Sequence, residues 1–196
     1  MNYPAGVKPR ASASSPKAKK KKTLKVAAGN RGMSFEAAIN ATNEYYKEKG
    51  ICLVTKRPTP INIVKVDYSH GATITQAYFE TQSTTDYNGI CRGRYIDFEA
   101  KSTRNKTSFP LANIPVQQID HLERVLSQGG IAFFLIDFEL LHEVYLLPAA
   151  YVIVFYRERE RASIPVEEIK KNGFLVKEGF MPRYDYFPVL EEAFLK

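Results

Sequence analysis

The chain of 196 residues is 44% hydrophobic and 25% charged, with a formal net charge of +7. This length and apolar content suffice for one compact domain with its own core, so a second domain is not required. Apolar runs stay below the ~18 residues of a membrane-spanning helix, and Pro, Ser and Lys interrupt the N-terminus where a signal peptide needs an apolar stretch. We therefore expect a cytoplasmic protein with no membrane partner.

The basic character of the chain belongs to its N-terminus. Residues 1–31 hold nine of the 28 Lys and Arg and none of the 21 Asp and Glu, which leaves 19 basic and 21 acidic residues in the rest. Residues 1–29 cannot bury enough apolar surface to offset the entropy of ordering, so we expect a disordered basic arm there. Such an arm either keeps the protein soluble or binds a polyanion without sequence choice.

The chain has two cysteines, Cys52 and Cys91. Their spacing forms no metal-binding pattern, and two thiols so far apart do not suggest a disulfide-stabilised scaffold. We interpret them as small, buried or half-buried residues.

The first half of the chain predicts one helix followed by several strands. The helix is expected over residues 34–49, because Phe35, Ile39 and Tyr46 fall on one stripe and Ser34 can cap the first turn. Strands are expected over residues 51–56, 61–66 and 74–80, where residues that favour strands recur. The polar stretch 67–75 is either a loop or the tip of a projection.

A turn and an alternating strand follow. Residues 86–89, Asp-Tyr-Asn-Gly, have turn chemistry because Asn-Gly tolerates positive φ. The strand predicted over residues 95–101 alternates strictly, and every second residue from Ile96 onward is apolar and would face the core. The residues between them place three charges side by side on the other face: Asp97, Glu99 and Lys101.

The second half predicts helices over residues 115–128, 148–157, 165–171 and 188–195, and strands over residues 131–138 and 143–147. The strand at 131–138 is continuously apolar, so we expect it at the centre of a sheet with both faces buried. Helices and strands therefore mix along the chain, which predicts an α/β domain.

The chemistry of the charged strand suits a hard metal ion. A hairpin can bring Asp86 and Glu99 together, and Mg²⁺ prefers such oxygen ligands, with the backbone carbonyl of Ala100 as a further candidate. Lys101 lies on the face of Glu99, where an ammonium can stabilise a phosphoryl transition state. Against this stands an ordinary surface pair, because Glu-x-Lys is common in exposed strands. Asp97 is a further candidate ligand on the same face.

The chain resembles the RecU family of Holliday junction resolvases, within the PD-(D/E)xK nuclease superfamily. The similarity is carried by residues 30–33, 56–60, 83–89, 93–101 and 105–110. It implies a restriction-endonuclease-like fold, in which helices flank a mixed central sheet. The nuclease domain would span residues 30–196, with a projecting stalk over about residues 60–78.

The resemblance also implies roles for particular residues. Asp86 and Glu99 would be catalytic metal ligands for Mg²⁺, with Thr84 and Gln118 as further positions in the metal shell, and Lys101 would stabilise the transition state. Thr85 replaces the proline that the superfamily has before its first acid. Without the resemblance, Gln118 reads as an amide on the flank of a helix. Its neighbour Gln117 points ~100° away, so only one of the two can face the metal.

Several residues are candidates for contact with DNA. The basic candidates are Arg31, Lys56, Arg57, Arg92, Arg94, Arg104 and Lys106. As a group they favour a surface that tracks the phosphate backbone, and the chain has no base-reading motif, so we expect recognition by shape. Tyr78 and Phe79, near the end of the stalk segment, either stack on bases or pack at the base of the stalk.

We therefore expect a Mg²⁺-dependent endonuclease that resolves four-way junction DNA by paired symmetric nicks in recombination and repair. The resemblance implies a homodimer, since two symmetric nicks suit a two-fold assembly, and an association with RecA. A duplex endonuclease of restriction type and a noncatalytic DNA-binding protein that modulates a recombinase remain alternatives. A weaker alternative is an RNA-binding protein of ribosomal type, suggested only by the basic arm.

Overall fold

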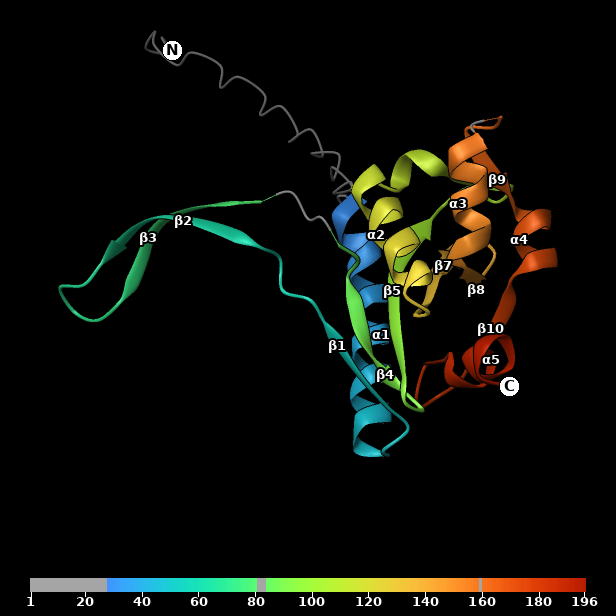
Figure 1. Ribbon diagram of the computed structural model, residues 1–196, viewed down its shortest axis with the longest axis horizontal. Coiled ribbons are helices and arrows are strands. Elements are labelled where there is room, and N and C mark those ends of the chain that lie inside the picture. Colours follow the sequence, from blue (N-terminus) through green and yellow to red (C-terminus); the bar gives the residue numbers. More distant parts are fainter. Residues whose placement is uncertain (1–27, 81–83, 159) are drawn as a thin grey trace, which may run out of the picture.

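The computed structural model describes residues 28–80, 84–158 and 160–196. Its centre is a seven-stranded sheet in the order β1-β4-β5-β7-β8-β10-β11 (Figure 1). The strands are β1 (Cys52–Lys56), β4 (Tyr87–Cys91), β5 (Arg94–Thr103), β7 (Ile131–Phe138), β8 (Glu143–Pro148), β10 (Phe174–Glu178) and β11 (Tyr184–Asp185). Neighbours β5 and β7 are parallel and the other pairs are antiparallel. The expected mixed α/β fold is confirmed.

Helices cover both faces of this sheet. On one face lie α1 (Ala28–Glu48) and the C-terminal α5 (Phe187–Leu190) with η2 (Glu191–Leu195); on the other lie α2 (Val116–Ser127), α3 (Ala149–Glu158) and α4 (Val166–Asn172). Strand β7 serves both sides, because Phe133 packs into the α1 core and Phe134 into the α2 core. Its predicted burial on both faces is confirmed. No helix in the described ranges is long and apolar enough to cross a bilayer.

Short elements complete the α2 side. The 3₁₀ turn η1 (Leu111–Asn113) precedes α2, and β6 (Ser108–Pro110) pairs with β9 (Ser163–Pro165). Because β6 follows β5 and β9 precedes α4, this pairing brings the segment after β5 close to the start of α4. Arg104 and Lys106, two of the candidate DNA-contact residues, lie in that segment.

A two-stranded hairpin projects from the domain. It consists of β2 (Ile61–Asp67) and β3 (Thr73–Phe79), and Figure 1 shows it extending far from the central sheet. Every residue of β3 is exposed, including apolar Ile74 and Tyr78. A hairpin with so little buried surface gains its order from strand pairing alone. The expected stalk is present, and the polar stretch at its middle is its tip.

Two predicted element boundaries differ from those in the structure. Helix α1 begins at Ala28, so Ser34 lies inside the helix and the prediction that it caps the first turn was wrong. The predicted turn at residues 86–89 is also wrong, because Tyr87–Cys91 forms β4. The turn lies instead at Arg92 and Gly93, which have φ angles of 49° and 74°. Two central residues with positive φ are what a tight hairpin of this kind requires.

Gly89 has a different purpose from the one expected. In β4 it packs against β1, and a Cβ at this position would come within 2.1 Å of the Leu53 carbonyl oxygen. The glycine permits close approach of two strands and does not make a turn.

The two cysteines are buried, as expected, but they also form a disulfide, which the sequence did not suggest. Cys52 and Cys91 are direct partners in the antiparallel pair of β1 and β4, with Cα atoms 4.5 Å apart. The β2–β3 hairpin lies in the chain between those strands, and it separates the two cysteines by 39 positions although strand pairing makes them neighbours. Sequence separation alone does not reveal such a register.

Asp137 on β7 makes the stability of the fold depend on pH. Burial and, to a lesser extent, repulsion from Glu139 raise its pKa to about 6, although a hydrogen bond from Ser102 acts to lower it. Because the folded pKa lies above the ordinary value of 3.8, the folded state is favoured by the neutral acid, and that stability is lost as pH rises toward 6 and above. Asp137→Asn is expected to stabilise the protein by about 1–2 kcal/mol at about pH 8 and hardly at all at about pH 4, measured by urea unfolding. An equal gain at both pH values would contradict this cause.

Candidate active site

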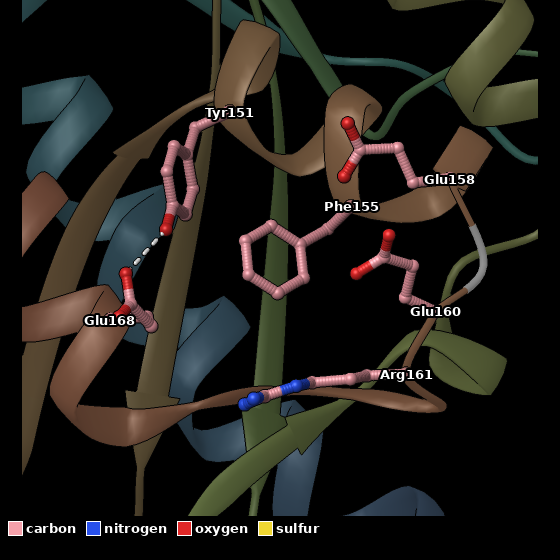
Figure 2. A pocket seen from close by; sticks show the side chains of 6 residues that line it. All are labelled: Tyr151, Phe155, Glu158, Glu160, Arg161 and Glu168. Carbon is pink, nitrogen blue, oxygen red and sulfur yellow. Dashed lines mark hydrogen bonds between the residues drawn. The ribbon is translucent and has the colours of Figure 1, made fainter.

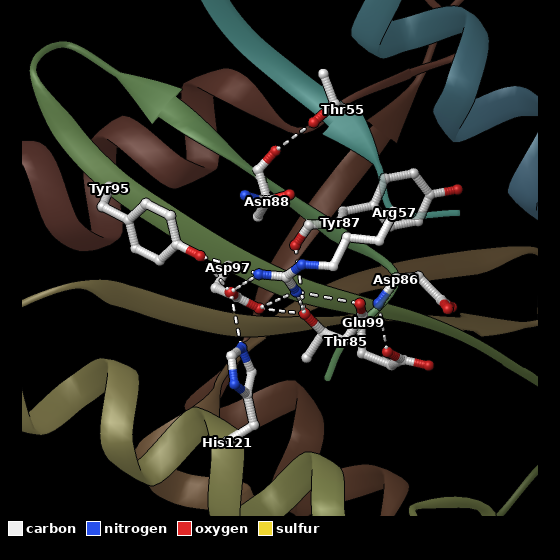
Figure 3. Close-up of polar contacts among 10 residues, drawn as sticks. All are labelled: Thr55, Arg57, Thr85, Asp86, Tyr87, Asn88, Tyr95, Asp97, Glu99 and His121. Atoms are coloured by element: carbon white, nitrogen blue, oxygen red, sulfur yellow. Dashed lines mark hydrogen bonds and ion pairs between the residues drawn. The ribbon is translucent and has the colours of Figure 1, made fainter. Parts of the chain in front are cut away.

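The β4–β5 hairpin brings the two candidate carboxylates together. Tyr87 pairs with Phe98, so the residue before Tyr87 lies opposite the residue after Phe98. The backbone N–H of Asp86 donates a hydrogen bond of 2.9 Å to Oε2 of Glu99 (Figure 3). The contact that the sequence predicted between these two segments is therefore present.

Lys101 completes this cluster. Its Nζ lies 2.6 Å from Oε1 of Glu99, and the Lys101 side chain keeps 19% of its surface exposed while that of Glu99 keeps 1%. Within this cluster the acid of Glu99 is buried and the ammonium of Lys101 is partly exposed. This arrangement leaves an ammonium on the exposed side of the cluster, where it can stabilise negative charge that develops nearby.

Glu99 is poorly stabilised as a carboxylate. Burial raises its pKa to about 7, with a smaller contribution from the nearby Asp86, and it does so although the ammonium of Lys101 acts to lower it. A buried acid beside a second, half-buried one needs more positive charge than one lysine provides. A bound cation supplies such charge, so the electrostatics fit a metal site.

Gln118 adds an oxygen donor. Its side chain is buried, and its Oε1 has no hydrogen-bond partner among the described residues. Helix α2 lies in the chain between the parallel strands β5 and β7, so it runs in the opposite direction to β5. Gln118 comes one helical turn before His121, which contacts Asp97, and Gln118 is therefore displaced from His121 in the direction of Glu99. The adjacent Gln117 is exposed. Of the two neighbouring amides, the buried one is therefore Gln118, the residue that the sequence put forward.

The donor set fits a hard cation. The candidate donors are the carboxylates of Asp86 and Glu99 and the unpaired amide oxygen of Gln118, and Mg²⁺ prefers oxygen ligands and retains waters. The described ranges contain no group of three or more His, Cys, Asp and Glu that could hold a metal by themselves, so the amide and water would have to complete the shell. Thr84 lies half-buried two residues before Asp86, and its place in a metal shell stays a prediction.

Asp97 is used for a different purpose. Its carboxylate is fully buried and accepts hydrogen bonds from four side chains: Arg57, Thr85, Tyr95 and His121 (Figure 3). Burial by itself raises its pKa, but these hydrogen bonds outweigh burial and lower it. Both of its oxygens are occupied by hydrogen bonds within the protein, which favours a structural role for Asp97 over metal binding.

Sequence reasoning missed two of the residues around Asp97, Tyr95 and His121, and noted Thr85 only as the replacement of a proline. Thr85, Tyr95 and His121 bind its carboxylate, and Tyr95 and His121 contact the same oxygen at 2.7 and 3.0 Å. Two spacings could have revealed them: Tyr95 lies two residues before Asp97 on one strand face, and His121 lies one helical turn after Gln118.

The candidate DNA-contact residues do not gather in one place. Lys56 pairs with Glu36, Arg94 donates to the Gly129 carbonyl at 3.2 Å, and Arg104 approaches Glu139 at 3.8 Å. All three side chains are partly exposed and remain able to meet a phosphate. Lys106 is exposed just beyond β5.

The other candidate DNA-contact residues lie in widely different places. Arg92 lies at the β4–β5 turn, beside Glu191. Since a strand rises about 3.3 Å per residue, Arg92 is roughly 20 Å from Glu99 along the hairpin. Arg57 is turned into the domain with 20% of its side chain exposed. Tyr78 and Phe79 are exposed at the root of the stalk, while the side chain of Arg31 lies outside the described residues. Contact of all these residues with DNA stays a prediction.

The molecule also has an acidic pocket beside α3 and α4, which is separate from the carboxylate pair. It has a volume of about 290 Å³ and is lined by Tyr151, Phe155, Glu158, Glu160, Arg161 and Glu168. Figure 2 shows Tyr151 donating a hydrogen bond to Glu168, at 2.8 Å. With three glutamates and one arginine, this pocket repels a phosphate and does not compete as the site of phosphodiester chemistry.

Comparisons with known proteins agree on one family. The model of the family described as RecU, recombination protein U, matches residues 30–192. Similar curated proteins, each named Holliday junction resolvase RecU, come from Geobacillus kaustophilus (47% identity, 99% of this chain and 98% of the relative), Streptococcus equi subsp. zooepidemicus (50%, 100% and 97%) and Lactococcus lactis (49%, 98% and 97%).

Among solved structures, the Holliday junction resolvase Hjc of Archaeoglobus fulgidus aligns at 10% identity and a TM-score of 0.40, over 70% of this chain and 94% of that chain. That likeness is too weak to carry an argument. The family match and the full-length relatives suffice: the chain belongs to the RecU family.

Proposed function

We propose that this protein is a Mg²⁺-dependent endonuclease that resolves Holliday junctions by paired symmetric nicks, in homologous recombination and DNA repair. The observation that carries the proposal is the cluster of Asp86, buried Glu99 and Lys101 on one hairpin. Full-length relatives named Holliday junction resolvase support the choice of substrate.

The residues divide the chemistry between them. Asp86, Glu99 and the amide of Gln118 would hold Mg²⁺, which when bound lowers the pKa of a water and neutralises charge on phosphoryl oxygens. The contact between the Asp86 N–H and Glu99 fixes the relative position of the two acids. Lys101, held by Glu99 at the exposed edge, would orient the attacking water and donate hydrogen bonds to the phosphoryl oxygens, where negative charge develops in the transition state.

The stalk would provide the preference for junctions. Its strands expose Tyr78 and Phe79 near the point where it joins the domain, and aromatic side chains can stack on bases that a branched structure leaves accessible. Neither the stalk nor the domain presents a recognised base-reading motif, so selection would rest on shape and backbone contacts.

Two nicks require two sites. A two-fold homodimer would place one site on each of two opposite strands of a junction that is itself approximately two-fold. We further propose that the dimer works in the cytoplasm and associates with RecA. A pull-down of purified RecA by the purified chain, with and without DNA, tests that association, and no recovery in either case would contradict it.

The activity is tested with purified protein on three labelled substrates: a synthetic four-way junction, a linear duplex and a single strand. We expect symmetric nicks in the junction with Mg²⁺, and none in EDTA. Equal cutting of junction and linear duplex would contradict junction selectivity and favour a duplex endonuclease. Junction binding without cutting in any divalent metal would favour a noncatalytic DNA-binding protein.

The N-terminal arm gives a separate prediction. Residues 1–27 carry eight Lys and Arg and no acid, and they lie outside the described residues. If the arm neutralises phosphates, its deletion should weaken junction binding and reduce the slope of log K against log salt, by about 0.9 for each phosphate that the arm had neutralised. Binding measured by fluorescence anisotropy across a salt series gives that slope. An unchanged slope would assign the arm to solubility.

A further inference from the structure

Arg57 occupies an unusual place for a residue expected to meet DNA. It directly follows β1, in the linker that leads to the stalk, yet its guanidinium is directed into the domain (Figure 3). Only 20% of its side chain is exposed. A phosphate-binding arginine needs free donors at the surface, and those of Arg57 are directed at groups of the protein itself.

One set of its hydrogen bonds fixes the segment that carries Asp86. The Arg57 backbone N–H donates to the Asp86 carbonyl at 2.7 Å, and Nη1 donates to the Thr85 carbonyl at 3.1 Å and to the Thr85 hydroxyl at 2.7 Å. Arg57 therefore holds the carbonyl on each side of the Asp86 Cα. Since the Asp86 N–H is bonded to Glu99, both peptide groups that flank this residue are fixed.

The other set reaches the strand that carries Glu99. Nη2 of Arg57 donates to Oδ2 of Asp97 at 2.7 Å, and Nη1 lies 3.3 Å from Oδ1. Asp97 lies two residues before Glu99 on the same face of β5 and is fully buried. It is anchored in turn by Tyr95 and His121. The guanidinium thus bridges the loop before β4 and the middle of β5.

We propose that Arg57 is a positioning residue of the active site, which sets the separation of the Asp86 and Glu99 carboxylates by joining the two segments that carry them. This inference rests on the proposed metal-dependent function of those carboxylates and reassigns Arg57 from the expected DNA surface. It acts through Thr85 and Asp97 and touches neither metal nor DNA.

The planar fork of arginine is essential to this role. The two N–H groups of Nη1 serve the Thr85 carbonyl and hydroxyl and share the longer approach to Oδ1 of Asp97, while Nη2 donates to Oδ2 of Asp97, because the N–H groups of a guanidinium diverge in a fixed plane. A lysine at position 57 keeps the charge but presents a single nitrogen. Arg57→Lys therefore retains the attraction to Asp97 and the backbone hydrogen bond to the Asp86 carbonyl, and loses the side-chain hydrogen bonds to Thr85.

The test compares Arg57→Lys and Arg57→Ala with Arg157→Lys as a matched control. Arg157 also donates from its guanidinium to two carboxylates, Asp120 and Glu123, but on the exposed surface of α2 and α3. Three quantities are measured for each variant: junction affinity in EDTA, the single-turnover cleavage rate at saturating protein with Mg²⁺, and the affinity for Mn²⁺ without DNA, by electron paramagnetic resonance.

We expect Arg57→Lys to bind junctions within about twofold of the unaltered chain. Its cleavage rate and its Mn²⁺ affinity should fall about ten- to a hundredfold, as when residues that support metal ligands are changed. Arg57→Ala should fall further, and Arg157→Lys should match the unaltered chain in all three quantities. If Arg57→Ala does not fold, judged by circular dichroism, Arg57→Lys decides alone.

Two results would overturn the proposal. Weaker junction binding with a smaller salt slope, at an unchanged single-turnover rate, would make Arg57 a DNA contact. A lower melting temperature with unchanged Mn²⁺ affinity and unchanged rate would make it a residue of stability only. If the unaltered chain cuts no DNA at all, the proposed function fails, while the Mn²⁺ measurement still decides the role of Arg57.

Discussion

Replacing Glu99 with Gln is expected to lower the rate of junction cleavage by at least about a hundredfold and to leave junction binding nearly unchanged. Glu99 is buried, touches both Asp86 and Lys101, and supplies the carboxylate around which the other groups are arranged. An amide keeps the shape of the side chain but removes its charge, so metal affinity falls while the fold remains. Single-turnover cleavage and anisotropy binding measure the two quantities on the same junction.

Asp86→Asn and Lys101→Ala should give the same separation of cleavage from binding. Lys101→Ala should differ in one respect, because Lys101 is not a ligand: Mn²⁺ affinity should be kept while the rate falls. Normal cutting by Lys101→Ala would contradict its assigned role, and Lys101 would then be only the ion-pair partner of Glu99. Loss of junction binding in Glu99→Gln would show that the acid acts in binding and not in chemistry.

Asp97→Ala is expected to cause the largest loss of stability, about 3–5 kcal/mol in the free energy of unfolding. The substitution removes a fully buried carboxylate that accepts hydrogen bonds from Arg57, Thr85, Tyr95 and His121. It leaves a largely buried guanidinium without its counter-ion. Urea unfolding followed by circular dichroism gives the free energy directly.

Asp120→Ala provides the control for this prediction. Asp120 also pairs with an arginine at 2.7 Å, but that pair is exposed, so its removal should cost much less. Equal small losses in both variants would contradict the view that Asp97 organises the hairpin. A stable Asp97→Ala protein that no longer binds Mn²⁺ would make Asp97 a metal ligand after all.

The sequence predicted the elements whose pattern depends on local composition. The apolar run of β7 and the strict alternation of β5 both identify strands, and Phe98 and Glu99 lie on the two faces that alternation requires. Alternation does not say how deeply each face is buried. The charged face of β5 was expected to be the more open one, yet α2 covers it and both Asp97 and Glu99 are buried.

The remaining features depend on distant parts of the chain. The Cys52–Cys91 bond and the close approach at Gly89 both follow from the register of β1 against β4, which no local pattern encodes. Strands β10 and β11 were not predicted, because they are short pieces that extend the sheet by pairing, β10 with β8 and the edge strand β11 with β10. The Asp97 cluster was missed because its donors come from four separate segments of the chain, which only the fold brings together.

A plasmid that extrudes a cruciform tests the central claim most directly, because its two products are easily separated. Two symmetric nicks made in one binding event convert the supercoiled circle to linear DNA, whereas single unpaired nicks give open circles. With Mg²⁺ we expect mainly linear plasmid from the unaltered chain and uncut supercoils from Glu99→Gln. Open circles alone, or equal cutting of the same plasmid without the cruciform sequence, would contradict the proposal that this hairpin site resolves Holliday junctions.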